Sequence, residues 1–263
     1  MNLQLSDKTA LVTGSTAGIG LAIAEELARE GASVFIAGRG REKIDEALRR
    51  LGYGRAGVRV EGIVADAGAP EGAAMLFERV PQVDILVNNL GSYEPKPFAE
   101  IPDEDWLKLF NVNVMSGVRL SRHYFPQMLA HGWGRVIFVA SESAVMTPPE
   151  MIHYGMTKSS QLALSRGMAE LTKGTRVTVN TVMPGPTRSE GIVEFLRMAS
   201  PGAKDQAEAE SEFFRVHRPS SLLQRLIDPQ EIAHLVAYLA SPLSSATNGA
   251  ALRVEGGLLR SIV

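Results

Sequence analysis

The sequence predicts a doubly wound α/β fold, in which helices cover both faces of one parallel β-sheet. Short β-branched runs alternate with longer amphipathic stretches along the whole chain, which is the pattern of consecutive βαβ units. The runs are almost uniformly apolar, as in VIFVA at 136–140, so both faces of the sheet should be buried. No linker, repeat or change of composition divides the chain, and we therefore expect a single domain over residues 1–263.

The expected elements alternate in chain order. Strands are expected at 9–14 (TALVTG), 33–38 (SVFIAG), 58–66 (VRVEGIVAD), 83–89 (VDILVNN), 135–141 (RVIFVAS), 176–185 (RVTVNTVMPG) and 251–256 (ALRVEG). Helices are expected between them, at 19–30, 41–51, 70–80, 103–131, 152–172 and 229–240. The strands are short and β-branched and the helices are longer and amphipathic, which is the basis for distinguishing them.

One segment, 186–227, departs from this alternation. It is charged, contains two short amphipathic pieces and is broken by Ser-Pro-Gly at 200–202. It leaves the carboxyl end of an expected strand, and open α/β sheets bind their ligands at that edge. We expect the segment to be a substrate lid. The alternative is a surface loop without a role.

Composition narrows the classes of function. The formal net charge is −2 and no basic cluster dominates, so we expect neither a nucleic-acid nor a membrane partner. There are no cysteines, and the five histidines show no metal-ligand spacing, so we expect no metal site. The N-terminus lacks the pattern of a signal peptide and no apolar run could span a bilayer, which favours the cytoplasm.

A glycine-rich turn, TGSTAGIG at 13–20, joins the first strand to the first helix. Gly14, Gly18 and Gly20 would let the backbone approach a pyrophosphate, and the helix N-terminus would supply free N–H groups. Because the turn lies between a strand and a helix, it predicts a dinucleotide site. The alternative is a tight strand–helix connection that binds no ligand.

The second strand indicates which dinucleotide is bound. It is followed by Arg39, with Arg41 and Lys43 close by, where sites for NAD usually carry an acid. An arginine would pair with the 2′-phosphate of NADP through charge-assisted hydrogen bonds. The pattern therefore favours NADP over NAD, with NAD still possible, unless Arg39 simply faces water.

TGSTAGIG, NNLG at 88–91, and Tyr154 with Lys158 occur in this order, and the chain resembles the short-chain dehydrogenase/reductase family over residues 8–257. Members such as the 3-oxoacyl-[acyl-carrier-protein] reductases are the most similar in pattern. The resemblance implies a Rossmann fold and an NAD(P)-dependent oxidoreductase that transfers a hydride between nicotinamide and a ketone or secondary alcohol. It also implies a homo-oligomer, a dimer or a homotetramer, with a dimer face formed by 103–131 and 152–172.

The resemblance carries over to specific cofactor contacts. These are Gly14, Ser15, Thr16, Gly18, Ile19, Gly20, Arg39, Asp66, Asn89, Gly91, Tyr154, Lys158, Pro184, Gly185, Thr187 and Ser189. Asp66 would contact the adenine and Pro184–Gly185 the nicotinamide. The sequence departs from the family pattern at Leu90, usually Ala, at Ala17, often basic in members that prefer NADP, and at Glu142.

By the same resemblance, Asn113, Ser141, Tyr154 and Lys158 would be the catalytic residues. Tyr154 would be the general acid in reduction and the base in oxidation. Ser141 would donate a hydrogen bond to the substrate oxygen, and Asn113 would hold a water beside Lys158. Tyr154 and Lys158 are four residues apart, on one face of the expected helix.

The pKa of Tyr154 can be estimated from the charge of Lys158 alone. Lowering a tyrosine pKa from about 10 to ~7 requires roughly 4 kcal/mol, and one cation ~4 Å away supplies about that much. We therefore expect Lys158 to lower the pKa of Tyr154. His153 points elsewhere, because neighbours in a helix do not share a face.

The motifs leave the substrate open. A 3-oxoacyl thioester is the commonest substrate by analogy, and a sugar, a steroid or another small alcohol fits equally well. Two other functions fit the same fold. One is an inactive cofactor-binding sensor or scaffold, and the other is a lyase or epimerase.

Overall fold

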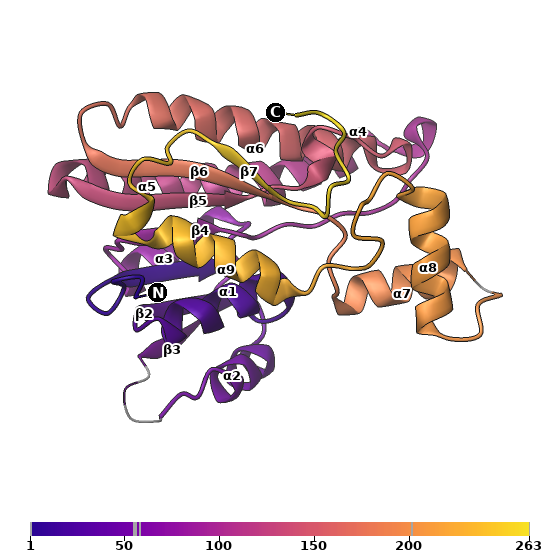
Figure 1. The fold of residues 1–263 in the computed structure, drawn as a ribbon. Helices are drawn as coiled ribbons and strands as arrows, with labels where there is room; N and C mark the ends of the chain where they lie inside the picture. The colour runs from indigo at the N-terminus through magenta and orange to yellow at the C-terminus, as the bar shows by residue number, and fades with distance from the viewer. Residues whose placement is uncertain (1, 55–56, 58, 201, 263) are drawn as a thin grey trace.

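The computed structural model describes residues 2–54, 57, 59–200 and 202–262, which form one seven-stranded parallel sheet (Figure 1). The strand order is β3-β2-β1-β4-β5-β6-β7. The strands are β1 Thr9–Thr13, β2 Ser33–Gly38, β3 Val60–Val64, β4 Ile85–Asn88, β5 Trp133–Val139, β6 Arg176–Pro184 and β7 Ala251–Val254. The order of the chain reverses between β1 and β4, and this is the point where a doubly wound sheet opens a crevice at its carboxyl edge.

The predicted fold class and all seven strands are confirmed. The strands differ from the expected ranges mainly at their ends. The strand expected at 58–66 spans Val60–Val64, and residue 58 of that prediction lies outside the described residues.

Helices cover the sheet on both faces. The α-helices of the described residues are α1 Gly18–Arg29, α2 Arg41–Arg50, α3 Pro70–Arg79, α4 Asp103–Phe110, α5 Ser116–His131, α6 Ile152–Glu170, α7 Glu190–Ala199, α8 Gln206–His217 and α9 Pro229–Ala240. The helices α1, α2 and α9 pack on one face, and α3, α5 and α6 pack on the other. The sheet therefore has no solvated face, as its apolar strands predicted.

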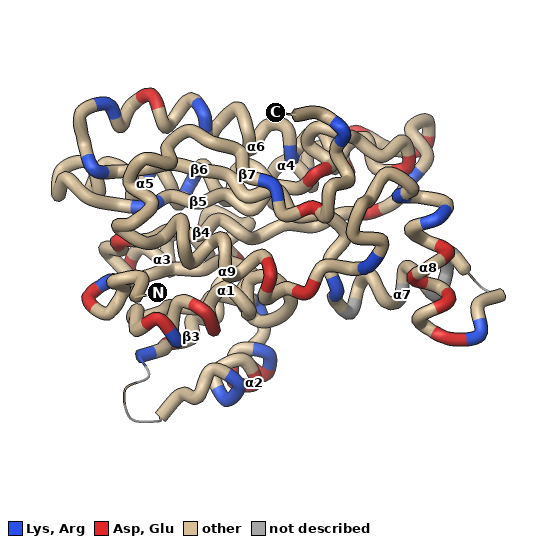
Figure 2. The backbone as a smooth tube through the Cα atoms, in the orientation of Figure 1, with Lys and Arg blue, Asp and Glu red and all other residues tan. Residues whose placement is uncertain are grey.

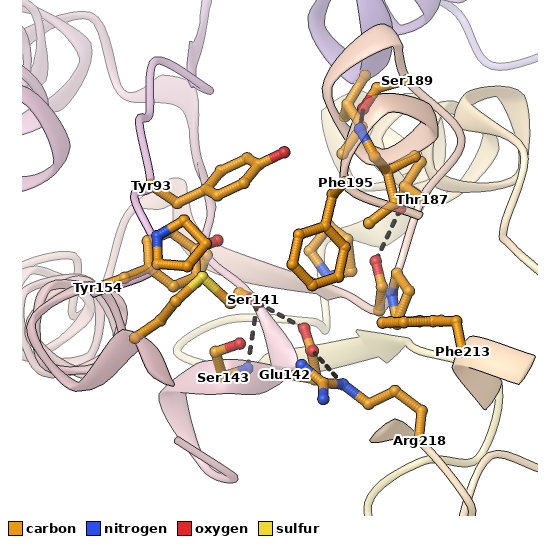
Figure 3. Close-up of a pocket in the computed structure, with 18 of the residues that line it drawn as sticks. Tyr93, Ser141, Glu142, Ser143, Tyr154, Thr187, Ser189, Phe195, Phe213 and Arg218 are labelled. Carbon is orange, nitrogen blue, oxygen red and sulfur yellow. Dashed lines mark hydrogen bonds and ion pairs between the residues drawn. The ribbon is translucent and has the colours of Figure 1, made fainter. Parts of the chain in front are cut away.

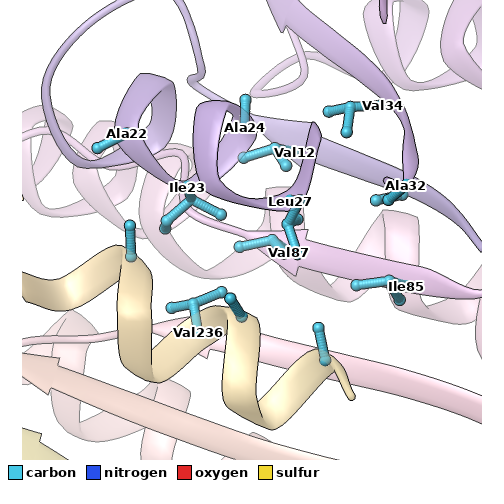
Figure 4. Packing of buried hydrophobic residues seen from close by; sticks show 14 of the residues in the cluster. Val12, Ala22, Ile23, Ala24, Leu27, Ala32, Val34, Ile85, Val87 and Val236 are labelled. Carbon is cyan, nitrogen blue, oxygen red and sulfur yellow. The ribbon is translucent and has the colours of Figure 1, made fainter. Parts of the chain in front are cut away.

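Side-chain alternation along the strands divides the core into two clusters. In β4, Ile85 and Val87 point to the cluster under α1 and α9, and Leu86 points to the cluster under α3 and α5. Figure 4 shows the first cluster, in which Val236 of α9 packs toward the residues of α1 and the strands. Each fully buried aliphatic side chain of this kind contributes about 1.5–3 kcal/mol relative to an exposed one.

The helix expected over 103–131 is interrupted, which corrects the prediction. A π-helical turn at Asn111–Met115 separates α4 from α5. Such a turn widens the helix by one residue and often occurs at a functional site. Here the side chain of Asn113 bonds both backbone groups of Ser92, with Oδ1 accepting from N at 2.7 Å and Nδ2 donating to O at 2.9 Å. A 3.6-residue hydrophobic period does not reveal one extra residue in a turn.

The segment 186–227 folds as a small unit beside the sheet. Its two amphipathic pieces are α7 and α8, which stand beyond one end of the sheet (Figure 1). They share an apolar cluster of Leu196, Ala209, Phe213, Phe214 and Leu226. The expected break at 200–202 follows α7, and its central residue, 201, lies outside the described residues.

Charges of both signs are interspersed over the elements in the view of Figure 2. Among the described residues, no helix combines the length and apolar character needed to cross a membrane. Within the same residues, no group of three His, Asp or Glu side chains is arranged to hold a metal ion.

Candidate active site

The glycine-rich turn after β1 leaves room for a phosphate at the start of α1. Gly14 and Gly18 have φ angles of 60° and 54°, which favour glycine. A Cβ at Gly20 would overlap the carbonyl oxygen of Gly14 and the side-chain amide of Asn89. The residue before α1, Ala17, offers no side-chain cap to the first N–H groups of the helix. These free donors and the positive end of the helix dipole fit an anionic pyrophosphate.

Two side chains hold the turn in shape. Asn89 Nδ2 donates to the carbonyl oxygens of Thr13 at 2.9 Å and Gly14 at 3.1 Å. Ser15 is fully buried, and its hydroxyl donates to Val12 O and accepts from Ala37 N. We expected Ser15 to contact the cofactor. Its side chain points inward and joins β1 to β2, and a contact of Ser15 with the cofactor stays a prediction.

Replacing Gly20 by Ala is expected to weaken NADPH binding at least tenfold and to lower the free energy of unfolding by about 1–3 kcal/mol, the usual cost of overpacking. The reason is that the new methyl group must displace backbone at Gly14. Fluorescence titration with NADPH and thermal unfolding measure the two effects. Gly40→Ala is the control, since a Cβ there meets open space, and equal behaviour of the two variants would refute the close packing.

Arg39 and Asp66 follow neighbouring strands at the carboxyl edge. Arg39 comes directly after β2 and is exposed, and a Cβ at the preceding Gly38 would contact the side chain of Thr16 in the glycine turn. Asp66 follows β3, is exposed, and accepts a hydrogen bond from Gly68 N at 3.0 Å. Both side chains therefore lie at the edge where the predicted adenosine end of the cofactor would lie.

The four predicted catalytic residues come from three elements that meet beside this turn. Ser141 follows β5, Tyr154 and Lys158 lie on α6, and Asn113 lies in the π-helical turn. The Lys158 Nζ atom lies 5.6 Å from the centroid of the Tyr154 ring. A Cβ at Gly91 would lie 3.4 Å from the same Nζ, so Gly91 of the NNLG motif also lies at the site. All four residues are thus on one side of the crevice.

Lys158 is held by groups that the sequence analysis did not single out. Its Nζ donates to Val139 O at 2.9 Å and to Gln161 Oε1 at 3.3 Å. Gln161 Nε2 donates in turn to the carbonyl oxygen of Asn113 at 2.5 Å. We expected Asn113 to hold a water beside Lys158. In the structure the buried side chain of Gln161 links Lys158 to the backbone of Asn113, and the water at Asn113 stays a prediction.

The pKa of Tyr154 shifts in the direction opposite to the expected one. Burial, reinforced by the nearby Glu142 carboxylate, raises the pKa of Tyr154. Burial also lowers the pKa of Lys158 to about 8, against the opposing effect of Glu142. The estimate from charge alone failed because both groups are desolvated and the Lys158 amine is turned toward Val139 and Gln161. Tyr154 therefore keeps its proton at neutral pH, as a general acid for carbonyl reduction must.

The segment after β6 forms the opposite wall. Pro184 ends β6, and a Cβ at Gly185 would lie 2.8 Å from the Cα of Glu255. Thr187 Oγ1 donates to Gly185 O at 2.8 Å, and Ser189 Oγ accepts from Ile192 N at the start of α7. These hydroxyls fix the turn that leads into α7.

A cavity of about 260 Å³ lies between the two walls. Figure 3 shows Tyr93 and Tyr154 on one side, with Phe195 of α7 across from them. The Tyr93 hydroxyl reaches the first turn of α7, since a Cβ at Gly191 would lie 2.9 Å from it. Ile19 and Gly20 of the glycine turn line the same cavity. The phosphate turn and two of the predicted catalytic residues, Ser141 and Tyr154, thus face one space.

Two buried charges lie in the wall beside Ser141. Glu142 Oε2 accepts from Ser141 Oγ at 2.5 Å, and Glu142 Oε1 lies 3.8 Å from Nε of Arg218. Arg218 follows directly after α8, so this contact joins 186–227 to the end of β5. His153, by contrast, packs against Trp106 with a ring separation of 5.7 Å and stays apart from this group.

Comparison with known proteins identifies the chain. The sequence model described as short chain dehydrogenase matches residues 8–198. This chain belongs to that family. It is an oxidoreductase of the short-chain dehydrogenase type. It is 53% identical to the "uncharacterized oxidoreductase YvaG" of Bacillus subtilis, with both chains covered in full.

Two solved structures resemble the oxidoreductase along its length. L-sorbose reductase from Gluconobacter frateurii, complexed with NADPH and L-sorbose, is 30% identical with a TM-score of 0.91, covering 100% of both chains. The actinorhodin polyketide ketoreductase with NADPH is 32% identical with a TM-score of 0.85, covering 95% of this chain and 97% of the other.

Several residues of the oxidoreductase site escaped the sequence analysis. Gln161 is one helical turn after Lys158, a spacing that signals contact on a helix. Tyr93, Phe195, Phe213 and Arg218 gave no such signal, because they reach the cavity only through tertiary packing. Arg218 lies within the expected lid, but the sequence did not reveal Glu142 as its ion-pair partner.

Proposed function

We propose that the protein is an NADP-dependent carbonyl reductase that transfers a hydride from the nicotinamide to a ketone, or back from the secondary alcohol. The observation that carries this proposal is the meeting of Ser141 and Tyr154 with the glycine turn around one cavity, with Lys158 buried beside Tyr154. The cofactor would supply the hydride. Tyr154 would give its proton to the substrate oxygen, and Lys158 would hold the ribose end of the nicotinamide.

Cofactor choice rests on Arg39 and on the family neighbours. Arg39 follows β2 in a place where a 2′-phosphate could reach it, and both solved neighbours described above hold NADPH. The guanidinium would pair with that phosphate, which NAD lacks. NADP is therefore the proposed cofactor, with Asp66 toward the adenine and the segment from Pro184 to Ser189 around the nicotinamide.

Arg39→Asp is expected to lower the preference for NADP over NAD by ten- to a hundredfold, since a hydrogen bond to a charged group contributes about 1.5–3 kcal/mol. The measurement is kcat/KM with each reduced cofactor. Arg49→Asp, the same charge change at the far, exposed end of α2, is the control. An unchanged cofactor ratio in Arg39→Asp would remove Arg39 from the site.

The substrate we favour is a small ketone that also carries a hydroxyl group. Glu142 supplies a buried acceptor beside Ser141, and a hydroxyl next to the reacting carbonyl could donate to it. The L-sorbose reductase neighbour supports this class. A 3-oxoacyl thioester is the second candidate, because the aromatic walls of Phe195 and Phe213 suit an acyl chain and a polyketide ketoreductase is a neighbour.

We propose that 186–227 is the substrate lid. Phe195 and Phe213 contribute to the cavity wall, Tyr93 contacts its first helix, and Arg218 contacts Glu142. Closure over the substrate would exclude water from the hydride path.

We also propose a cytoplasmic homodimer or homotetramer, since Leu107 of α4 and Met156 of α6 expose apolar side chains on the expected dimer face.

The test is a screen of hydroxyketones, simple ketones and 3-oxoacyl thioesters with NADPH and NADH, followed through the absorbance of the reduced nicotinamide. The proposal predicts turnover of at least one ketone class with NADPH. An inactive sensor or scaffold predicts cofactor binding without turnover of any compound. A lyase or epimerase predicts product without net consumption of the cofactor.

A further inference from the structure

The hydroxyl of Ser141 already has a partner for its single proton. Ser141 Oγ donates to Glu142 Oε2 at 2.5 Å and accepts from Ser143 N at 3.1 Å. A serine hydroxyl has only one hydrogen to donate. While Glu142 is a carboxylate, that hydrogen is therefore unavailable to a substrate oxygen.

The proposed function, on which this inference rests, needs the same hydrogen. Ser141 is to donate to the carbonyl oxygen as negative charge develops on it. Two acceptors thus compete for one donor, and the competition disappears if Glu142 carries a proton of its own. The acid form can donate from its O–H to Ser141 Oγ, so that Oγ accepts from Glu142 and Ser143 and its own hydrogen is free.

We propose that Glu142 is a positioning residue whose protonation switches Ser141 between a donor to the substrate and a donor to Glu142. One solvent proton binds to the carboxylate and one hydrogen bond reverses direction, with no covalent bond formed or broken except the O–H bond of Glu142. The acid form is competent for reduction, and the carboxylate form withholds the serine donor.

The surroundings of Glu142 suit such a switch. Its side chain is buried, and burial raises its pKa, while the hydrogen bond from Ser141 and the charge of Arg218 oppose that rise. Arg218 Nε lies 3.8 Å from Glu142 Oε1, which is too far for a hydrogen bond. This nitrogen is buried and has no hydrogen-bond partner among the described residues. These two interactions therefore offset only part of the cost of burying the carboxylate, and Glu142 can adopt either protonation state.

The charged and titratable groups around the carboxyl come from three parts of the fold. They are Arg218 after α8, Tyr154 and Lys158 on α6, and Tyr93 and Glu150 in the cavity wall. Burial raises the pKa of both tyrosines, so they stay neutral where Glu142 titrates. Lys158 titrates near 8. Variants of Glu142 therefore decide whether a decrease in activity comes from its carboxyl.

The test is the pH dependence of kcat/KM for ketone reduction. Wild type is expected to lose about 10²-fold, the effect of one donor to a developing oxyanion, as pH rises through the pKa of Glu142. Glu142→Gln and Glu142→Ala are both expected to lack this inflection, because neither has an ionisable group there. Arg218→Met should move the inflection to higher pH, since the cation that favours the carboxylate is gone.

Glu150→Gln is the matched control, because it removes another carboxyl of the same cavity that is not among the described hydrogen-bond partners of Ser141. It should keep the wild-type inflection, and thermal unfolding checks that every variant is folded. An inflection below pH 8 that persists in Glu142→Gln and Glu142→Ala would overturn the switch, as would its absence from wild type. Absence of turnover of every ketone by wild type with NADPH would instead refute the proposed function itself, so the two failures are distinguishable.

Discussion

Tyr154→Phe is expected to lower kcat for ketone reduction by about 10³-fold, within the range that a general acid contributes. The ring would still pack beside Tyr93, at a centroid separation of 6.0 Å, and only the proton donor would be lost. NADPH binding, measured by fluorescence titration, should change by less than threefold. Single-turnover kinetics separates the chemical step from binding.

Tyr93→Phe is the matched control, since Tyr93 lines the same cavity and its hydroxyl faces α7. It should keep kcat within about tenfold. If Tyr154→Phe turns over ketones at the wild-type rate, the hydroxyl of Tyr154 is not the proton donor.

Lys158→Met should lower kcat/KM for reduction at least 10²-fold without destabilising the fold. The Lys158 pKa is about 8, against an ordinary value of 10.5, so the folded protein disfavours the ammonium. At ~1.4 kcal/mol for each pKa unit, burying that charge costs about 3 kcal/mol near neutral pH. The cost is full below pH 8 and is relieved as pH rises toward 10.5, because over this range the unfolded chain holds more protons.

Methionine removes this cost but leaves Val139 O and Gln161 Oε1 without their donor, at about 1–3 kcal/mol. The two effects offset each other, so the melting temperature at pH 7 should equal or exceed that of wild type while kcat/KM falls at least 10²-fold. Thermal unfolding from pH 7 to 10 measures the melting temperatures. That of wild type should rise relative to that of the variant as pH rises. A melting temperature well below wild type would make Lys158 a stabilising residue instead.

The parts of the fold that follow from local pattern were predictable. The apolar strands, the helices between them and the position of the glycine turn were all visible in the sequence, because each depends on residues near in the chain. The meeting of Ser141 with Tyr154 followed from the resemblance to a family with a fixed topology. The π-helical turn around Asn113 was not visible, since one additional residue leaves the hydrophobic period nearly unchanged.

The electrostatics of the site were not predictable for a different reason. An ion pair between Glu142 and Arg218 joins residues 76 positions apart, and its geometry depends on how 186–227 folds back. The pKa of Tyr154 depends on burial, which a spacing of four residues does not report. The sequence therefore placed the reacting groups, while their protonation required the packing around them.

The central claim is that this cavity passes a hydride to a carbonyl carbon. The most direct test incubates the protein with NADPH that carries deuterium at the reactive C4 position, together with a ketone identified in the screen. Mass spectrometry of the product should find one deuterium on the new alcohol carbon, and none with Tyr154→Phe beyond its residual rate. Tight binding of the labelled cofactor with no transfer of deuterium to any ketone would contradict the account.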